Sequence, residues 1–200
     1  MQIMFDFKGD FRNYPICLEL IGTGYSSKSY KTNDNKCWKI YDPIKILKLQ
    51  HIIEFNYIEM EERINSLVNM SFPEWAIKPI RTIYDFRGVI GIEMPYIAGI
   101  TLHKKSLNSK IPKHILQQVY DIICWCENNA FCPDLDLSNF ILDLNDKVWL
   151  CDLDSAKFNK FKNIFIPYKT YRNLFHPDPS YIPDDYYLAF KNIIQKLELL

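Results

Sequence analysis

Residues 133–156 read PDLDLSNFILDLNDKVWLCDLDSA, and this segment carries the most information about the architecture. Two short apolar segments, 140–143 and 147–151, flank the turn residues Leu144-Asn145-Asp146 and predict a β-hairpin. Asp134 and Asn139 precede the hairpin, and Asp152 follows it. The hairpin is therefore expected to return Asp152 to the loop that carries the other two side chains.

These three side chains suit phosphoryl transfer. Amide and carboxylate oxygens are the hard ligands that Mg²⁺ prefers, and a metal that bridges phosphates needs only one or two of them. A separate carboxylate can orient an attacking hydroxyl and accept its proton. Asp and Asn also supply turns, which is the ordinary interpretation of any one of them. The spacing of the whole set favours the chemical interpretation.

Upstream, residues 21–30 read IGTGYSSKSY between two predicted strands. Gly22 and Gly24, with one residue between them on a turn, allow backbone amides to approach a phosphate chain closely. A plain turn is the commoner role of such a pattern. Lys39 strengthens the phosphate interpretation, because it lies in the apolar strand 36–41, and such a strand seldom keeps an inward Lys without an anion.

A counter-charge for Lys39 is available on a predicted helix over residues 50–69, which Pro73 terminates. Glu61 falls within the apolar stripe of this helix, so its carboxylate is expected to face inward towards Lys39. The alternative is that Glu61 lies at the edge of the stripe and reaches water, in which case Glu62 replaces it.

The remaining pattern predicts strands first and mainly helices later. Further strands are expected at 16–22, 28–32, 79–84 and 88–94, and further helices at 112–130 and 184–199. This order favours an α+β fold in two lobes over an alternating parallel sheet.

Composition excludes several classes of function. Lys plus Arg equals Asp plus Glu at 24 each, so there is no basic excess for nucleic acid or an anionic membrane, although a local basic patch is compatible with this sum. No run of about 18 apolar residues predicts a membrane span, and the first residues contain no apolar stretch long enough to predict a signal peptide. Six cysteines without a CxxC pair predict reduced thiols in a cytosolic protein. Secretion without a cleavable signal stays open.

Over residues 17–160 these motifs, in this order, resemble those of the protein kinase superfamily. IGTGYSSKSYK is similar to the Gly-rich loop, WKIY to the strand that bears the ATP-contacting lysine, and MEERI to the segment around the helix glutamate. PDLDLSNFIL is similar to the catalytic loop and CDLDSAKF to the magnesium-binding DFG region. The resemblance implies ATP and Mg²⁺ as cofactors, Asp134 and Lys39 as catalytic residues, and Asn139 and Asp152 as metal ligands.

The same resemblance implies one minimal kinase domain over residues 1–200. It has a β-rich N-lobe at about 1–94, a hinge at about 95–99 and a truncated, mainly helical C-lobe at about 100–200. In the hinge sequence EMPYIA, residues 93–98, Met94 corresponds to the gatekeeper and Ile97 to the residue whose N–H binds adenine. Pro95 falls where only a carbonyl is used, so its missing N–H is harmless.

The sequence also departs from the family pattern. The third glycine of the loop is Ser27, and Cys132-Pro133 replaces the His-Arg before the catalytic aspartate, so activity is not expected to need a phosphorylated activation loop. Asp136 replaces a phosphate-contacting Lys and adds a carboxylate to the catalytic candidates. Asp154 replaces the DFG glycine and is either a further metal ligand or a spacer.

The short C-terminal part is similar to that of minimal effector kinases of the OspG-like type, which bacterial pathogens inject into host cells. This implies a monomeric Ser/Thr protein kinase acting on host proteins or on the ubiquitin-conjugating machinery, with Asp185 supporting the catalytic loop. Two alternatives stay open. One is a pseudokinase scaffold, and the other is a small-molecule kinase of the aminoglycoside or choline type.

Overall fold

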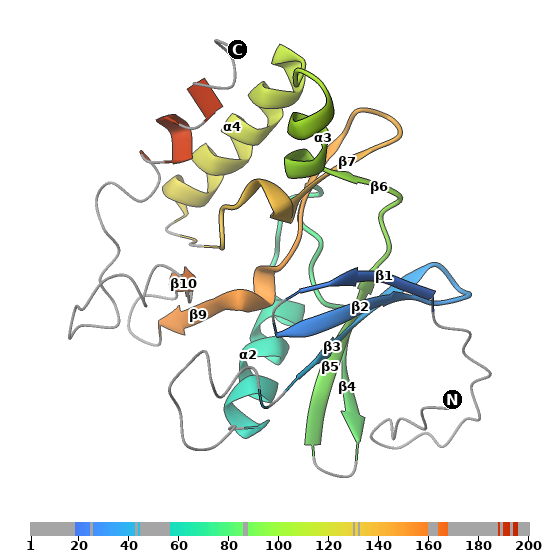
Figure 1. The fold of residues 1–200 in the computed structure, drawn as a ribbon. Coiled ribbons are helices and arrows are strands. Elements are labelled where there is room, and N and C mark those ends of the chain that lie inside the picture. Colours follow the sequence, from blue (N-terminus) through green and yellow to red (C-terminus); the bar gives the residue numbers. More distant parts are fainter. Residues whose placement is uncertain are drawn as a thin grey trace. The chain divides into compact units, whose positions relative to one another are not determined.

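The computed structural model describes residues 19–24, 26–42, 44, 57–85, 88–129, 131, 133–159, 164–167, 188, 190–192, 194 and 195 (Figure 1). The chain divides into two units. Unit 1 comprises Met1–Ser71 and Lys78–Tyr96, and unit 2 comprises Phe72–Ile77 and Ile97–Leu200. The boundary between Tyr96 and Ile97 falls within the segment predicted as the hinge.

Unit 1 contains a five-stranded antiparallel sheet with strand order β1-β2-β3-β5-β4. The strands are β1 (Glu19–Thr23), β2 (Ser27–Lys31), β3 (Lys36–Tyr41), β4 (Arg81–Asp85) and β5 (Gly88–Pro95). The predicted strands are confirmed to within two residues at each end, apart from residues 16–18, which lie outside the described part.

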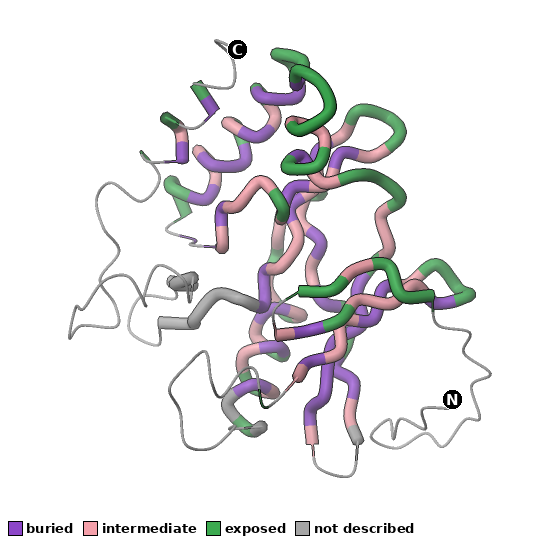
Figure 2. Tube along the Cα trace, viewed as in Figure 1, coloured by how far each residue is buried: buried purple, intermediate pink, exposed green. Residues whose placement is uncertain are grey.

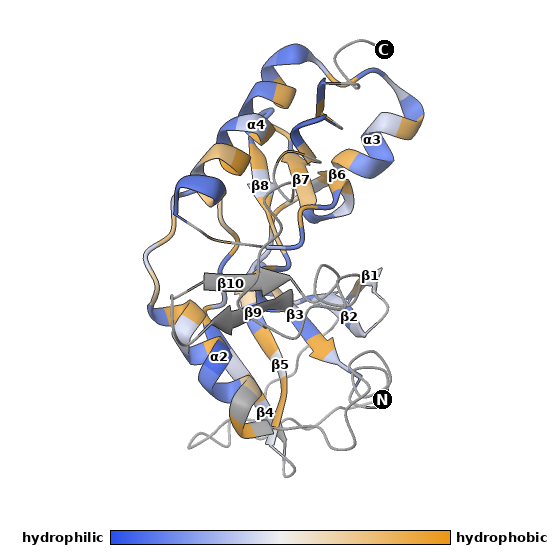
Figure 3. Cartoon of the chain, turned by 90° about the vertical axis from the view of Figure 1, so that its left-hand side faces the viewer, coloured by the Kyte–Doolittle hydropathy of each residue, from blue (hydrophilic) through white to orange (hydrophobic). Residues whose placement is uncertain are grey.

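One helix of unit 1, α2 (Tyr57–Asn69), packs against β4 and β5. Its buried positions, Met60, Ile64 and Leu67, recur at helical spacing, as the sequence pattern predicted. The part of the predicted helix from 50 to 56 lies outside the described residues. Figure 3 shows mixed hydropathy along α2 beside a largely hydrophobic β5, as expected for a helix that covers one face of a sheet.

Unit 2 contains a three-stranded antiparallel sheet with strand order β6-β7-β8. Its strands are β6 (Gly99–Thr101), β7 (Phe140–Asp143) and β8 (Val148–Leu150), so the predicted hairpin is confirmed. The segment Phe72–Ile77 joins this unit through β8. Ala76 forms a parallel bridge with Leu150, and Leu150 exchanges backbone hydrogen bonds of 2.9 Å with Trp75 and Ile77.

Two helices precede the hairpin, α3 (Leu102–Asn108) and α4 (Lys113–Asn128). The second confirms the helix predicted at 112–130, whereas α3 was not predicted. The side chain of Thr101 caps α3 by accepting a hydrogen bond from the backbone N–H of Lys104. Further short elements are η1 (Leu137–Asn139), η2 (Leu153–Ser155), β9 (Ala156–Asn159) and β10 (Ile164–Pro167).

The core of unit 2 lies between α4 and the sheet (Figure 2). On α4 the buried residues form one stripe: Ile115, Leu116, Val119, Ile122, Ile123 and Cys126. An aromatic cluster of Phe72, Trp75, Trp125 and Phe131, with ring centroids 5.2–6.3 Å apart, holds the inserted segment against α4.

Parts of the predicted helix at 184–199 are also described. Leu188, Phe190–Asn192, Ile194 and Gln195 are helical, and Phe190 stacks on Phe140 at a centroid distance of 5.8 Å. Asp185 lies outside the described residues. Among the described cysteines, Cys37 and Cys126 are buried and Cys124 and Cys151 are half-buried, and their reduced state stays a prediction. No helix within the described ranges is long and apolar enough to cross a membrane.

Candidate active site

The register of the five-stranded sheet places Gly22, Lys39 and Met94 on one face. Residues directly opposite each other on antiparallel strands share a face, and one such row crosses all five strands: Gly22, Ser29, Lys39, Ile92 and Thr82. Cys37, two residues before Lys39 and therefore on the same face, is opposite Met94. Three of the residues predicted to bind the cofactor are thus brought to the same surface of unit 1.

The other face of the sheet is structural. Glu93 is only 4% exposed, and it accepts hydrogen bonds from the Trp38 indole at 2.9 Å and from the Arg81 guanidinium at 3.1 and 2.9 Å. This carboxylate therefore ties β3, β4 and β5 together. Because side chains alternate along a strand, the adjacent Met94 points to the Lys39 face, where it is buried.

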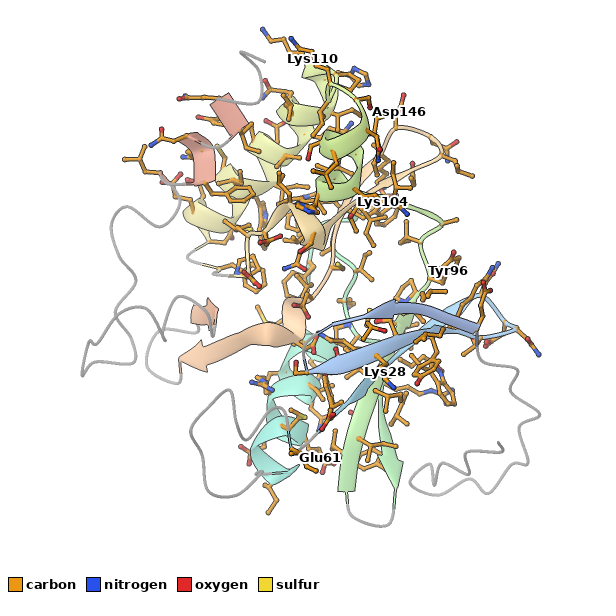
Figure 4. All side chains as sticks on the ribbon, in the orientation of Figure 1. Lys28, Glu61, Tyr96, Lys104, Lys110 and Asp146 are labelled. Atoms are coloured by element: carbon orange, nitrogen blue, oxygen red, sulfur yellow. The ribbon has the colours of Figure 1, made fainter. Side chains whose placement is uncertain are left out.

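Glu61 approaches the Lys39 face from α2. The hydroxyl of Tyr84 donates a hydrogen bond of 2.6 Å to Oε1 of Glu61, the residue labelled on α2 in Figure 4. Tyr84 follows Thr82 by two residues on β4 and so shares its face of the sheet. Glu61 is half-buried and Glu62 is exposed, so the structure favours Glu61 over its replacement. The contact between Glu61 and Lys39 stays a prediction.

The environment of Tyr84 changes its acidity. Burial, together with the hydrogen bond to the Glu61 carboxylate, raises the pKa of Tyr84 from 10.0 to about 12. Tyr84 was not among the residues predicted from the sequence, because its contact with Glu61 depends on the strand register. At neutral pH the tyrosine is a stable donor that fixes the carboxylate of Glu61 on the sheet.

Lys39 itself is half-buried in β3. Its Nζ lies 5.9 Å from the centroid of the Tyr41 ring, which is the outer range of a cation–π contact. Partial burial suits a lysine that binds an anionic ligand, because the ammonium loses only part of its hydration.

The glycine turn closes with a hydrogen bond of 2.9 Å from the N–H of Gly24 to the carbonyl of Ser27. A Cβ at Gly22 would lie 3.8 Å from Ser29 Cβ, and a Cβ at Gly24 would lie 3.5 Å from the nearest atoms of Ser27, both ordinary contacts. Neither glycine has a positive φ. Neither the backbone conformation nor the neighbouring atoms therefore require glycine at these two positions. A ligand that approaches the backbone closely would provide such a reason.

Asn139 links the predicted catalytic residues of unit 2. Its side-chain Nδ2 donates a hydrogen bond of 2.9 Å to the backbone carbonyl of Asp134, and its own carbonyl accepts one of 2.9 Å from the N–H of Cys151. The loop of Asp134 and the segment that leads into Asp152 are thus joined at one residue. Since Nδ2 is used in this bond, Oδ1 of Asn139 is the atom that can serve as a ligand.

Asp136 has a clear local role. It is the N-cap of η1, where its Oδ1 accepts hydrogen bonds from the Ser138 N–H at 2.8 Å and from the Ser138 hydroxyl at 2.6 Å. This cap accounts for an aspartate at the position without any chemistry, so the catalytic role of Asp136 stays a prediction only.

The two aspartates after the hairpin differ in environment. Asp152 is half-buried and has a φ of 63°, in the left-handed region. Asp154 lies in η2 and is only 5% exposed. Their roles as metal ligands stay predictions. The described residues contain no group of three or more His, Cys, Asp or Glu side chains able to hold a metal, yet one amide oxygen and one carboxylate suffice for Mg²⁺ bound to phosphates.

The predicted hinge spans the end of β5 and the start of unit 2. Tyr96 donates a backbone hydrogen bond of 3.3 Å to the carbonyl of Asn35, and its ring lies 4.6 Å from Nζ of Lys31. Ile97, the predicted adenine contact, follows as a half-buried residue outside any helix or strand. Its role stays a prediction.

Comparison with known proteins bears on the fold. Among the solved structures that match is the crystal structure of Rad53 1-466 in complex with AMP-PNP, with a TM-score of 0.54 and 14% sequence identity. The match covers 70% of this chain and 39% of that chain. No protein-family model and no curated protein matches. The chain therefore has a protein-kinase-like fold of the α+β class.

Proposed function

We propose that this protein is an ATP- and Mg²⁺-dependent protein kinase that phosphorylates Ser or Thr hydroxyls. The observation that best supports the proposal is the position of Asn139, which joins the loop of Asp134 to the segment entering Asp152 through two hydrogen bonds. Asn139 therefore connects the loop of Asp134, the proposed nucleophile-orienting carboxylate, with the segment of Asp152, its proposed partner as a metal ligand. The complex of AMP-PNP with the structurally similar Rad53 is compatible with a nucleotide as ligand.

In the proposed mechanism each residue has a distinct task. The Asp134 carboxylate orients the substrate hydroxyl and accepts its proton, while the substrate oxygen forms a bond to the γ-phosphorus and the bond from that phosphorus to the bridging oxygen breaks, so that ADP leaves with the bridging oxygen. Lys39, positioned by Glu61, contacts the phosphates, and the amides of the Gly22–Gly24 turn approach them. Asn139 Oδ1 and the Asp152 carboxylate would hold Mg²⁺, which would offset negative charge on the phosphates.

The cellular role that we propose rests on the resemblance to minimal effector kinases. In it the protein is a monomer that reaches a host cytosol and acts on host proteins or on the ubiquitin-conjugating machinery. The proposal for transfer chemistry does not depend on this role.

A transfer assay tests the chemistry. The purified chain is incubated with Mg²⁺ and γ-labelled ATP, with and without a eukaryotic lysate, beside Asp134→Asn and Asp152→Ala. Asp134→Asn should reduce transfer by about 10²–10⁴-fold while nucleotide binding is retained, because only proton acceptance is lost. Asp121→Asn, an isosteric change at an exposed residue of α4, is the matched control and should leave transfer unchanged.

The outcomes separate the alternatives. Label that is lost in both active-site variants supports the kinase. ATP binding without transfer under any condition would instead indicate a pseudokinase, and transfer to an aminoglycoside or choline but to no protein would indicate a small-molecule kinase. Transfer that is unchanged in Asp134→Asn would contradict the mechanism.

A further inference from the structure

A basic segment lies in unit 2, beside the predicted catalytic loop. From Met94 to Tyr120 the chain contains no acidic residue. Within this range, α3, the segment that follows it and the start of α4 carry six basic side chains, which we call the basic strip: His103, Lys104, Lys105, Lys110, Lys113 and His114. This local asymmetry stands out in a chain whose total charge is zero.

The lysines of the basic strip are available to a partner. Lys104, Lys110 and Lys113 are exposed and Lys105 is half-buried, and Lys104 and Lys110 are labelled in Figure 4. Within the part of the chain that the structure describes, none of the four forms an ion pair. His114, by contrast, has Asp146 at 3.8 Å, and Lys147 pairs with Glu74. The strip therefore presents uncompensated positive charge.

Three features favour a protein partner over other anionic partners. Leu107 is 73% exposed and lies three residues after Lys104, on the same side of α3. No Phe, Trp or Tyr occurs between Tyr96 and Tyr120, although aromatic residues interleave with cations where single-stranded nucleic acid binds. The seven residues of α3 are also too few for the long amphipathic helices that lie on membranes.

The position of the strip connects it with the proposed reaction. α3 packs against η1 in the same unit, and η1 contains Asn139 and is capped by Asp136. A substrate segment that lies along α3 is thus close to the loop that carries Asp134. Charge complementarity then selects a segment of opposite sign.

We infer that the basic strip binds an acidic segment of the protein substrate, one in which Asp or Glu residues and an apolar residue flank the Ser or Thr that is phosphorylated. This inference rests on the proposed function and extends it to a substrate class. Lys104, Lys110 and Lys113 provide the attraction, and Leu107 provides the apolar contact.

Two fluorescent peptides test the inference. Both contain the same Ser and Leu, and one carries Glu and Asp at the flanking positions where the other carries Gln and Asn. Fluorescence anisotropy, measured without ATP, should show binding of the acidic peptide that weakens with salt. The double change Lys104→Glu with Lys110→Glu should weaken it by about tenfold or more, because it converts attraction into repulsion.

Lys28→Glu is the control for each single Lys-to-Glu change, because it makes that change once at an exposed lysine of unit 1, outside the strip, and it is used only in the binding measurement without ATP (Figure 4). It should leave the affinity for the acidic peptide unchanged, whereas Leu107→Gln should lower it. In transfer assays the double variant should raise KM for the acidic peptide and leave kcat unaltered.

The results distinguish this inference from the proposed function. Binding that depends on the basic strip, without phosphate transfer to any peptide, would overturn the proposed kinase function but support the strip as a binding surface. If the wild type and the double variant bind and phosphorylate both peptides equally, the basic strip is not the substrate-binding surface, whereas the proposed kinase function is supported. Strip-dependent binding of phosphatidylserine vesicles or of a single-stranded oligonucleotide, with no preference for the acidic peptide, would also overturn the inference.

Discussion

Among individual residues, Asp152 stands out for its backbone. Three described residues other than glycine have a positive φ: Asn35, Asp146 and Asp152. The first two lie in the tight turns of β-hairpins, where their N–H groups close the turn onto Thr32 and Asp143. Asp152 follows β8 and is in no hairpin turn. The unusual backbone conformation therefore occurs at the residue that we predict to bind the metal. Strained residues tend to cluster at functional sites.

This backbone leads to a first prediction. Asp152→Gly and Asp152→Ala should both lose Mg²⁺-dependent nucleotide binding, since both lack the carboxylate. The glycine variant should be more stable than the alanine variant by about 1 kcal/mol, because only alanine is strained at a φ of 63°. Urea denaturation measures the difference. Equal stabilities would contradict the backbone argument, and retained nucleotide binding would contradict the role as a ligand.

Tyr84 leads to a second prediction, at the same scale. Tyr84→Phe should destabilise the protein by about 1 kcal/mol at pH 8, because Glu61 loses a donor. The raised pKa means that the folded state keeps the phenolic proton when the unfolded state has lost it. This stabilisation is therefore complete below pH 10 and disappears as the pH rises towards about 12.

The pH dependence gives the measurement for Tyr84. Stabilities of the wild type and Tyr84→Phe are compared by urea denaturation in steps from pH 8 upward. The difference between the two proteins should shrink above pH 10, while contributions from the other tyrosines cancel. A difference that is constant over this range would show that the pKa of Tyr84 is not raised in the folded protein.

At the scale of elements, the sequence was informative where a pattern repeats. α4 has a regular apolar stripe, and the β7–β8 hairpin has a clear turn, so both were predicted closely. α3 has seven residues, fewer than two full repeats of an amphipathic pattern, and gave no periodic signal. β6 has three residues and depends on pairing with a strand about forty positions later.

The residues of the candidate site also differ in whether a sequence pattern reveals them. Lys39, Asn139 and Asp152 were found through motifs, whereas Tyr84 required knowledge of the strand register. Asp136 was interpreted as a catalytic candidate, although the pattern Asp-x-Ser, with a polar side chain two residues on, is also typical of a cap. Local sequence cannot separate these roles, because the same carboxylate serves both.

Two glycines give a third prediction, which concerns the sheet. A Cβ at Gly91, on β5, would lie 2.4 Å from the backbone carbonyl oxygen of Lys39 on β3. Gly91→Ala should therefore cost about 1–3 kcal/mol, since backbone in a central strand pair must move. Gly24→Ala meets only ordinary contacts and should leave stability within about 0.5 kcal/mol.

The two variants make a matched pair for thermal denaturation and ATP binding. Gly24→Ala should lower the affinity for ATP without loss of stability, because the turn is proposed to approach the phosphates. A stable Gly24→Ala variant with unchanged affinity would argue against that role. An undisturbed Gly91→Ala variant would show that β3 and β5 are farther apart than the structure indicates.

At the scale of the whole molecule, the residues that we propose bind ATP and Mg²⁺ include members of both units. Gly22, Lys39 and Glu61 belong to unit 1, and Asn139 and Asp152 belong to unit 2. Mg²⁺-ATP at a hundred times its Kd should stabilise the wild type by about 2.7 kcal/mol. That corresponds to a rise in Tm of about 5–10 °C for a chain of this size.

This fourth prediction is tested by differential scanning fluorimetry with ATP, with and without Mg²⁺. Lys39→Ala and Asp152→Ala should each reduce the rise in Tm, although they lie in different units, whereas Asp121→Asn should keep it in full. A shift that survives both active-site substitutions would place the nucleotide elsewhere on the chain.

The segment Phe72–Ile77 has a consequence for how the protein is made. It belongs to unit 2 but is translated before the last two strands of unit 1. Its partner Leu150 is translated about 74 positions after Ala76, which takes several seconds at roughly 5–20 residues per second. During that interval Phe72 and Trp75 lack the α4 and β8 surfaces that later cover them. A nascent chain therefore exposes an aromatic segment to which chaperones can bind. A fragment that starts at residue 97 lacks this segment and so lacks part of unit 2.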